Sequence, residues 1–294
     1  MVSVGTFDGI HKGHQAIIRR MTDIARENKL VSVIVTFDPH PRYVLKKDAG
    51  KLKLLSTTGE KIEKLAAAGI DYALIINFTE DFAKIPYEDF VKSCLIEDLC
   101  AKHIVAGFDH RFGENRSGDH DKLAGLKLKY GFSVTEIKAL NDDGSAISST
   151  KIRKLIENRE VDQANILLNY TYSLSGKVVM GNKTGRKLGF PTANLLVADP
   201  NKLIPGTGAY IVSVEIDGEH YFGMCNIGFK PTFEKQPLTI ETYILNFNKD
   251  IYGKNMSVGF ISFLRNEKKF DSIDLLKAQL EEDNKCVLKK INEQ

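Results

Sequence analysis

The first half of the chain, up to about Ile156, alternates short runs of β-branched residues with amphipathic stretches. The β-branched runs have strand length, and the apolar residues between them recur at helical spacing. This alternation predicts a parallel sheet wrapped by helices. Ligands of such sheets bind beyond the carboxyl ends of the strands, so chemistry is expected in the loops that follow them. Strands are expected at residues 2–4, 31–37, 72–78, 103–107 and 132–137, and helices at 14–27, 60–68, 87–99 and 119–130.

From about Thr171 the chain changes to strand-like runs separated by Gly, Pro, Asn and Asp, and it closes with a charged amphipathic stretch from about Ile273. This pattern predicts a small antiparallel Greek-key β-barrel with a terminal helix. Apolar residues at helical spacing in 149–170 predict two short helices before the barrel. We therefore divide the chain into a Rossmann-like α/β domain at residues 1–155, a helical linker at 156–170 and a barrel domain at 171–294.

Composition and charge narrow the classes of partner. The 294 residues suffice for two domains that each bury a core. The 41 Lys and Arg residues are interleaved with 38 Asp and Glu residues, which argues against a nucleic-acid partner and remains compatible with local phosphate sites. The four cysteines form no CxxC pair and are interpreted as buried free thiols. Without a leader-like start or an apolar run long enough to cross a bilayer, we expect a cytoplasmic protein that binds small molecules, neither nucleic acid nor membrane, as a monomer or weak homo-oligomer.

A glycine-rich loop with two histidines, from Gly5 to His14, follows the first predicted strand. Glycines at positions 5, 9 and 13 let the backbone approach a ligand closely, and the next helix offers free N–H groups and its positive dipole end to an anion. His11 and His14 can donate hydrogen bonds to phosphate oxygens while charge grows on a transferring group. A glycine turn with a capping aspartate and two solvated histidines is the alternative. The strand, loop and helix context favours a nucleotide site.

Three further segments of the first half follow strands or open helices. Residues 36–41 read TFDPHP, residues 107–113 read GFDHRFG, and residues 147–153 read ISSTKIR. The first could be only a proline turn, and the serines of the third could be only helix caps, although a capping loop can also take a phosphate.

Residues 181–194 read GNKTGRKLGFPTAN, with three glycines and three basic residues. The string suggests a loop that wraps phosphates, although it lacks the GxxxxGK[ST] pattern of a Walker loop. Glu241 lies in the apolar strand-like run 238–247, where an unpaired carboxylate is costly. A carboxylate beside an alcohol can orient the hydroxyl and accept its proton during phosphoryl transfer. A surface-facing glutamate on a half-exposed strand is the alternative.

Taken together, the segments of the first half resemble the FMN adenylyltransferase module of bacterial bifunctional riboflavin kinase/FAD synthetases, a relative of the HIGH-motif nucleotidyltransferases. The resemblance implies a flavin contact for Asp109. Family members usually have a longer stretch before this loop and an aromatic residue where His110 stands, so we expect a shortened first strand here. ATP contacts are implied for Gly5, Phe7, Asp8, Gly9, His11, His14, Ser149, Thr150 and Arg153, with His11 and His14 on the phosphates.

The second half matches the riboflavin kinase signature GxxxGRxLGFPTAN at every fixed position. The resemblance implies that magnesium is held by Thr192 and Asn194 and that Glu241 is catalytic. It also implies ATP contacts at Gly181, Gly185, Arg186, Gly189 and Thr192, and flavin contacts at Asn226, Arg265 and Phe270. A solvated charge run and a core aromatic would explain Arg265 and Phe270 equally well.

The resemblance implies an enzyme that phosphorylates riboflavin to FMN and then adenylylates FMN to FAD, with ATP as co-substrate and magnesium as cofactor. One alternative is a transferase that adenylylates or cytidylylates another phosphorylated alcohol, because the histidine loop is common to that superfamily. A second is a flavin-binding regulatory protein without turnover, which the retained histidines, Thr192, Asn194 and Glu241 disfavour. A nucleic-acid-binding role would require strong, salt-dependent retention on DNA.

Overall fold

The computed structural model describes residues 1–45, 52–108, 120–142, 144–181, 185, 189–229 and 238–292. The chain forms two compact units, Met1–Ser149 and Thr150–Gln294. The predicted boundaries at residues 155 and 170 stay predictions. Asp109, His110 and Arg186 lie outside the described residues.

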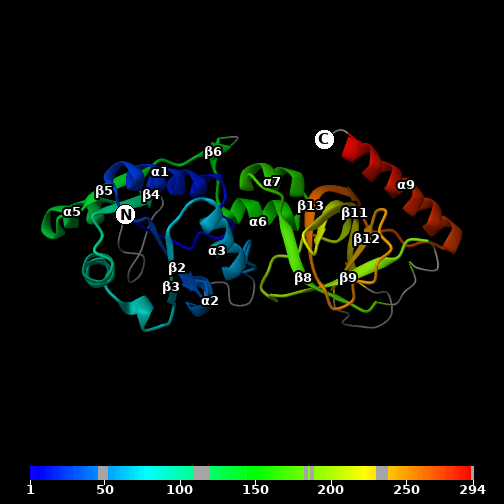
Figure 1. Cartoon of the computed structure of the whole chain (residues 1–294), viewed down its shortest axis with the longest axis horizontal. Coiled ribbons are helices and arrows are strands. Elements are labelled where there is room, and N and C mark those ends of the chain that lie inside the picture. The colour runs from blue at the N-terminus through cyan, green and yellow to red at the C-terminus, as the bar shows by residue number, and fades with distance from the viewer. Residues whose placement is uncertain are drawn as a thin grey trace. The chain divides into compact units, whose positions relative to one another are not determined.

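Within the described residues, the first unit is built on a five-stranded parallel sheet, as predicted (Figure 1). The strand order β3-β2-β1-β4-β5 places β1 between β2 and β4, where the direction of winding reverses. Loops after β1 and β4 therefore border the crevice in which ligands of such sheets bind. The expected short first strand is three residues long. The strands are β1 (Val2–Val4), β2 (Val33–Asp38), β3 (Tyr72–Asn77), β4 (His103–Gly107) and β5 (Ser133–Ile137).

Helices cover both faces of this sheet. Neighbouring residues of β2 point to opposite sides, so one strand contributes side chains to the core on each face. Ile34 packs with Met21 and Leu65, whereas Val35 packs with Val91 on the other face. One predicted helix, 87–99, is instead a short α-helix continued by a π-helical stretch. The helical elements are α1 (Lys12–Asn28), α2 (Pro41–Val44), α3 (Thr58–Ala67), η1 (Phe82–Lys84), α4 (Tyr87–Phe90), the π-helix η2 (Val91–Asp98) and α5 (His120–Tyr130); β6 (Asn141–Asp142) and β7 (Ser145–Ala146) form a small hairpin.

The predicted helices in 149–170 are α6 (Ser149–Glu157) and α7 (Val161–Leu168). The predicted barrel is also confirmed: in the described part of the second unit, six antiparallel strands close in the order β10-β11-β12-β9-β8-β13. Closure leaves no sheet edge unpaired. The strands are β8 (Ser173–Val179), β9 (Thr192–Val197), β10 (Gly208–Ile216), β11 (Glu219–Phe229), β12 (Leu238–Ile244) and β13 (Asn255–Arg265).

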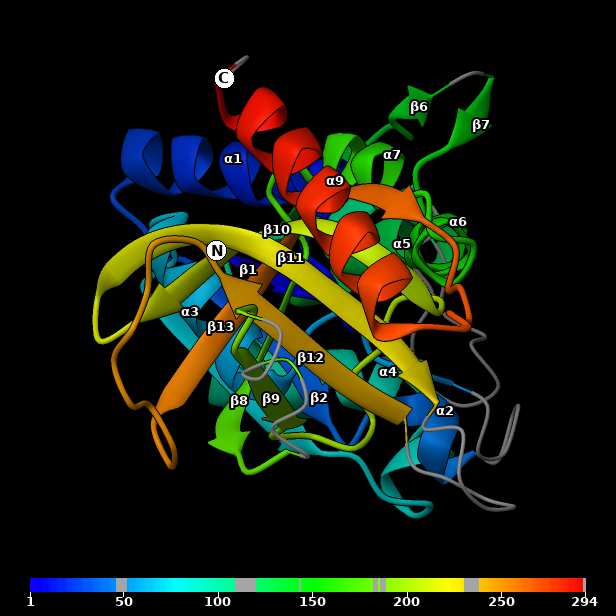
Figure 2. The ribbon, with the colours of Figure 1, turned by 90° about the vertical axis from the view of Figure 1, so that its right-hand side faces the viewer.

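The predicted terminal helix is α9 (Ile273–Asn292), which lies across the outside of the barrel against β11 (Figure 2). Val287 is fully buried there, in a cluster with Met224 and Leu245. Within the described ranges, no helix is both long and apolar enough to cross a membrane.

The expectation that all four cysteines are buried is wrong for Cys100, which is exposed. Cys94 and Cys286 are half-buried, and Cys225 is fully buried in the barrel. Burial, together with the nearby negative charge of Glu241, raises the pKa of the Cys225 thiol to about 12. Cys225 is therefore an inert core thiol.

Candidate active sites

The loop after β1 is held in a tight, strained path. Gly5 N–H donates to the carbonyl of Val35 at 2.9 Å, which fastens the start of the loop to β2. Phe7 has a φ of 47° and Gly9 a φ of 84°, both in the left-handed region. Because a side chain at position 5 would lie only 3.1 Å from the Phe7 ring, the glycine lets that ring fold back over the loop. Backbone strain of this kind is typical of ligand-binding loops.

His11 and His14 form a stacked pair at the start of α1. Their ring centroids lie 3.8 Å apart with planes 20° from parallel, and the Phe7 ring lies 5.1 Å from that of His14. Burial lowers the pKa of His14 well below its usual value, and the positive charges of His11 and Lys61 lower it further. His14 is therefore neutral near pH 7 and can donate a hydrogen bond without carrying a charge.

The helix end beneath this pair is open to an anion. His11 is the N-cap residue of α1, yet its side chain makes no capping hydrogen bond, and the first turn holds no acidic residue. The positive end of the helix dipole is therefore not neutralised by its own sequence. A phosphate beside His11 and His14 would meet that dipole and the first N–H groups of α1.

Asp8 has a structural role that sequence reasoning missed. Its carboxylate is buried and accepts hydrogen bonds from the backbone N–H groups of Leu55 and Ser56, each at 3.0 Å, while the Ser56 hydroxyl accepts from Gly9 N–H at 2.9 Å. These bonds fasten the glycine loop to the segment before α3. The contact with ATP predicted for Asp8 stays a prediction. In the structure, its carboxylate holds the glycine loop in position.

Ser149, at the start of α6, donates its hydroxyl proton to the backbone carbonyl of Asp8 at 2.9 Å. The structure thus brings one residue of the predicted second ATP motif to the first, although 141 positions separate them. Thr150 and Arg153 belong to the second unit, where Thr150 is exposed and the Arg153 side chain is buried. Their predicted ATP contacts stay predictions.

Lys61 on α3 is a second residue that sequence reasoning missed. Only 5% of the residue is exposed, and its ammonium donates to the Thr36 hydroxyl at 3.1 Å. That hydroxyl in turn bonds to the Thr6 carbonyl at 3.2 Å. Burial lowers the pKa of Lys61, and the carboxylates of Asp8 and Asp38 oppose that shift. In the sequence, Lys61 stands beside other charged residues of a predicted amphipathic helix, so nothing there indicated that its side chain is buried.

The second unit contains a cavity of about 340 Å³ at one side of the barrel. Residues that the sequence assigned to different roles meet in its wall, namely Gly185, Thr192, Asn226, Glu241, Arg265 and Phe270. Aromatic and aliphatic side chains from the barrel and α9 complete the wall, among them Phe190, Met224, Tyr243, Leu276 and Leu280. A mostly apolar cavity with a few convergent polar groups suits a flat aromatic ligand.

Glu241 stands in the middle of a polar row that crosses three strands. It lies directly opposite Asn226 on β11 and opposite Asn194 on β9, so the three side chains share one face of the sheet. One step along the same face, Tyr243 lies opposite Thr192. Over the described part of the chain, the Glu241 carboxylate makes no hydrogen bond or ion pair, so it is available to a ligand hydroxyl.

Tyr243 and Phe190 are cavity residues that were not predicted. Their rings meet edge to face with centroids 5.0 Å apart. Tyr243 could have been found, because it follows Glu241 by two positions on the same strand and must face the same side. Phe190 stands inside the kinase-like string, in which only the flanking glycine and threonine had been assigned.

Close contacts require two glycines of the kinase-like string, and the backbone conformation requires a third. A side chain at Gly181 would overlap the carboxamide of Asn194, and one at Gly185 would overlap the carbonyl of Phe190. Gly189 has a φ of 83°, which strains any other residue. Gly181 therefore leaves the space that the Asn194 carboxamide occupies, while its predicted ATP contact stays a prediction.

Thr192 and Asn194 suit a hard cation. They are two positions apart on β9 and present a hydroxyl and a carboxamide oxygen, which are donors that magnesium accepts. Among the described residues, no group of three or more His, Cys, Asp or Glu side chains could hold a metal ion. Magnesium usually keeps several waters and takes further ligands from phosphates, so two protein oxygens fit such a site.

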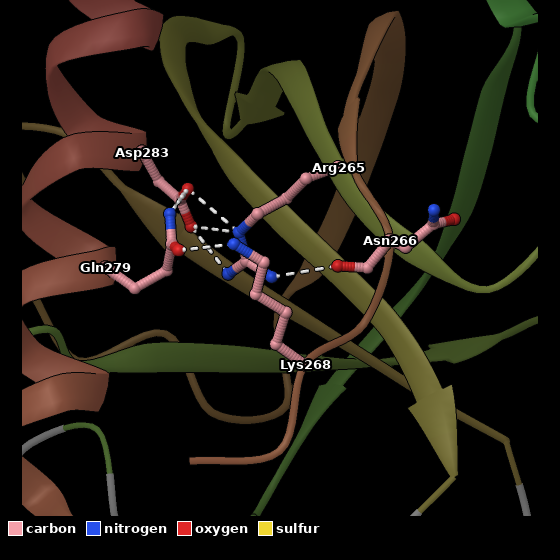
Figure 3. A network of polar contacts seen from close by, with 5 residues as sticks. All are labelled: Arg265, Asn266, Lys268, Gln279 and Asp283. Carbon is pink, nitrogen blue, oxygen red and sulfur yellow. Dashed lines mark hydrogen bonds and ion pairs between the residues drawn. The ribbon is translucent and has the colours of Figure 1, made fainter.

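Asn226, Arg265 and Phe270, the predicted flavin contacts in the described part, all line the cavity. The alternative explanation of Arg265 as part of a solvated charge run is wrong. Its guanidinium is mostly buried and forms an ion pair with Asp283 of α9 (Figure 3). Asp283 was not predicted.

Comparison with known proteins extends over both units. A family model described as FAD synthetase matches residues 1–151, and one described as riboflavin kinase matches residues 168–291. A bifunctional riboflavin kinase/FMN adenylyltransferase of Listeria monocytogenes is 40% identical over 96% of this chain and 90% of its own length, and that of Bacillus subtilis is 37% identical over the same shares. A crystal structure described as a macrolide-efflux protein from Streptococcus pneumoniae has a TM-score of 0.89 and 35% identity, covering 97% of this chain and 93% of its own.

Proposed function

The chain belongs to the family of bifunctional riboflavin kinase/FMN adenylyltransferases, and from this premise we propose that its two reactions take place at separate sites, one in each unit. The enzyme phosphorylates riboflavin to FMN and adenylylates FMN to FAD, using ATP in both steps. The barrel cavity carries out the first reaction, and the loop after β1 the second.

In the kinase reaction, Glu241 orients the terminal hydroxyl of riboflavin and accepts its proton. The alcohol oxygen forms a bond to the γ-phosphorus of ATP as the bond to ADP breaks. Asn226 contacts the flavin opposite Glu241, and Gly181, Gly185 and Gly189 contact the ATP phosphates. Thr192 and Asn194 would hold magnesium, which neutralises charge on those phosphates when bound. The polar row of Asn194, Glu241 and Asn226 carries this proposal.

In the adenylyltransferase reaction, an FMN phosphate oxygen attacks the α-phosphorus of ATP and pyrophosphate leaves. His11 and His14 donate hydrogen bonds to the ATP phosphates as charge develops, and the start of α1 adds its dipole. Asp8 keeps the glycine loop in place through its bonds to Leu55 and Ser56. No covalent intermediate with the protein is required.

Two single variants test the separation of sites. Glu241→Gln removes the proposed base of the kinase site, and His14→Ala removes a phosphate contact of the adenylyltransferase site. Each folded variant is expected to lose one reaction and keep the other, measured as FMN formed from riboflavin and FAD formed from added FMN. Loss of both reactions in either folded variant would contradict independent sites.

A further inference from the structure

A polar network ties α9 to the end of β13 beside the barrel cavity (Figure 3). The Arg265 Nε–H donates to the two carboxylate oxygens of Asp283 at 2.9 and 3.0 Å, and Nη2 donates to Oδ2 at 2.7 Å. Gln279 donates to Asp283 Oδ1 at 2.9 Å, and Lys268 donates to Gln279 Oε1 at 3.0 Å. The third guanidinium nitrogen, Nη1, donates to the Asn266 carbonyl at 3.1 Å. The strand end, the segment after it and the helix are thus joined.

The central ion pair is shielded from water. The Arg265 and Asp283 side chains are only 17% and 4% exposed. Solvent and salt weaken a buried ion pair much less than a surface pair. Removal of one partner leaves the other charge buried and uncompensated. Arg265 and Asp283 therefore hold each other in place.

The same helix supplies an apolar part of the cavity wall. Leu276, Leu280 and Asp283 follow one another at intervals of four and three positions, so they lie along one side of α9. All three line the cavity, together with Arg265. The position of the two leucines relative to the barrel therefore depends on what holds α9 there.

We propose that Asp283 is a positioning residue for riboflavin. By holding Arg265, it fixes α9 so that Leu276 and Leu280 form one wall for the flat, largely apolar ring system of the flavin. The inference rests on the proposed function only in taking the barrel cavity as the riboflavin site. Asp283 touches neither the transferred phosphoryl group nor the reacting hydroxyl in this account, so its loss acts on riboflavin binding and leaves the chemical step in place.

The test is steady-state kinase kinetics of the full chain with Asp283→Asn, which keeps the shape of the side chain and removes its charge. The KM for riboflavin is expected to rise about tenfold while kcat and the KM for ATP change less than about twofold, because uniform substrate binding is what is lost. Glu282→Gln is the matched control. It removes the same charge one position along α9, where Glu282 is exposed and only 3.7 Å from exposed Lys285. Glu282→Gln is expected to match the unaltered enzyme.

A second pair of variants separates positioning from direct flavin contact by Arg265. Arg265→Met alone leaves Asp283 buried without its partner and should raise the riboflavin KM. Combined with Asp283→Leu, it gives an apolar pair that can pack α9 onto the barrel, because matched apolar replacements often substitute for a buried ion pair. Recovery of the riboflavin KM to within about threefold of the unaltered enzyme supports the proposal.

Three results overturn the proposal: an unchanged riboflavin KM in Asp283→Asn, an equal rise in the KM for ATP, or a double variant as impaired as Arg265→Met alone. If Asp283→Asn fails to fold, the double variant decides between the two roles of Arg265. Absence of FMN formation by the unaltered chain would instead contradict the assignment of the kinase reaction, which distinguishes the two failures.

Discussion

Replacement of Glu241 by glutamine removes the basicity of the side chain and leaves its size almost unchanged. Asn226 and Asn194 flank Glu241 in neighbouring strands, and these backbone pairs fix its place whatever the side chain is. In the part of the chain that the structure describes, no hydrogen bond or ion pair holds the carboxylate. The free energy of unfolding should therefore change by less than about 1 kcal/mol.

The expected effect on the kinase reaction is much larger. A positioned general base contributes about 10²- to 10⁴-fold to a rate. The kcat for FMN formation should fall by that factor, which corresponds to about 3 to 5 kcal/mol in the activation free energy. The KM values should change little, because glutamine can still accept a hydrogen bond from the riboflavin hydroxyl.

The assay separates riboflavin, FMN and FAD by chromatography after reaction with ATP and magnesium. FAD formation from added FMN, measured on the same preparation, serves as the internal control and should stay within about twofold of the unaltered enzyme, because it uses a site in the other unit. A kcat for FMN formation within about threefold of the unaltered enzyme would refute Glu241 as the base.

Three further predictions address the loop after β1 and the kinase-like string. His14→Ala should reduce FAD formation from FMN at least about 100-fold and spare the kinase reaction; equal losses in both reactions would contradict the assignment. Because the pKa of His14 is lowered in the folded protein, the unfolded chain binds its proton more readily, so stability should fall as the pH drops below about 6.5; urea unfolding near pH 5 and pH 7.5 should show this, and His14→Ala should reduce the difference. Gly181→Ala should push the Asn194 carboxamide aside and raise the magnesium concentration for half-maximal FMN formation several-fold, roughly 1 kcal/mol; an unchanged requirement would separate Asn194 from the metal.

The parts of the fold with short-range patterns could be predicted from the sequence. The parallel sheet, the barrel and α9 could be predicted because the spacing of apolar residues within each strand or helix indicates its type. The histidine loop was recognisable because its glycines and histidines lie within ten consecutive residues. Even in that loop, the left-handed φ of Phe7 could not be predicted, because only glycine is a reliable sign of such a conformation.

Contacts between distant segments could not be predicted. Asp8 bonds to Leu55 and Ser56, 47 and 48 positions away, and nothing in the loop sequence distinguishes that task from contact with a ligand. Arg265 and Asp283 each stand among other charged residues, and their pairing depends on how α9 lies against the barrel. Such partners become visible only when the elements are packed.

We expect one chain to make FMN in the barrel and FAD at the histidine loop. The most direct measurement is a time course of the purified chain with riboflavin, ATP and magnesium, with both products separated by chromatography. FMN should appear first, and FAD should follow after a lag as FMN accumulates. FMN without FAD would contradict the adenylyltransferase site, and the absence of both products would contradict both site assignments.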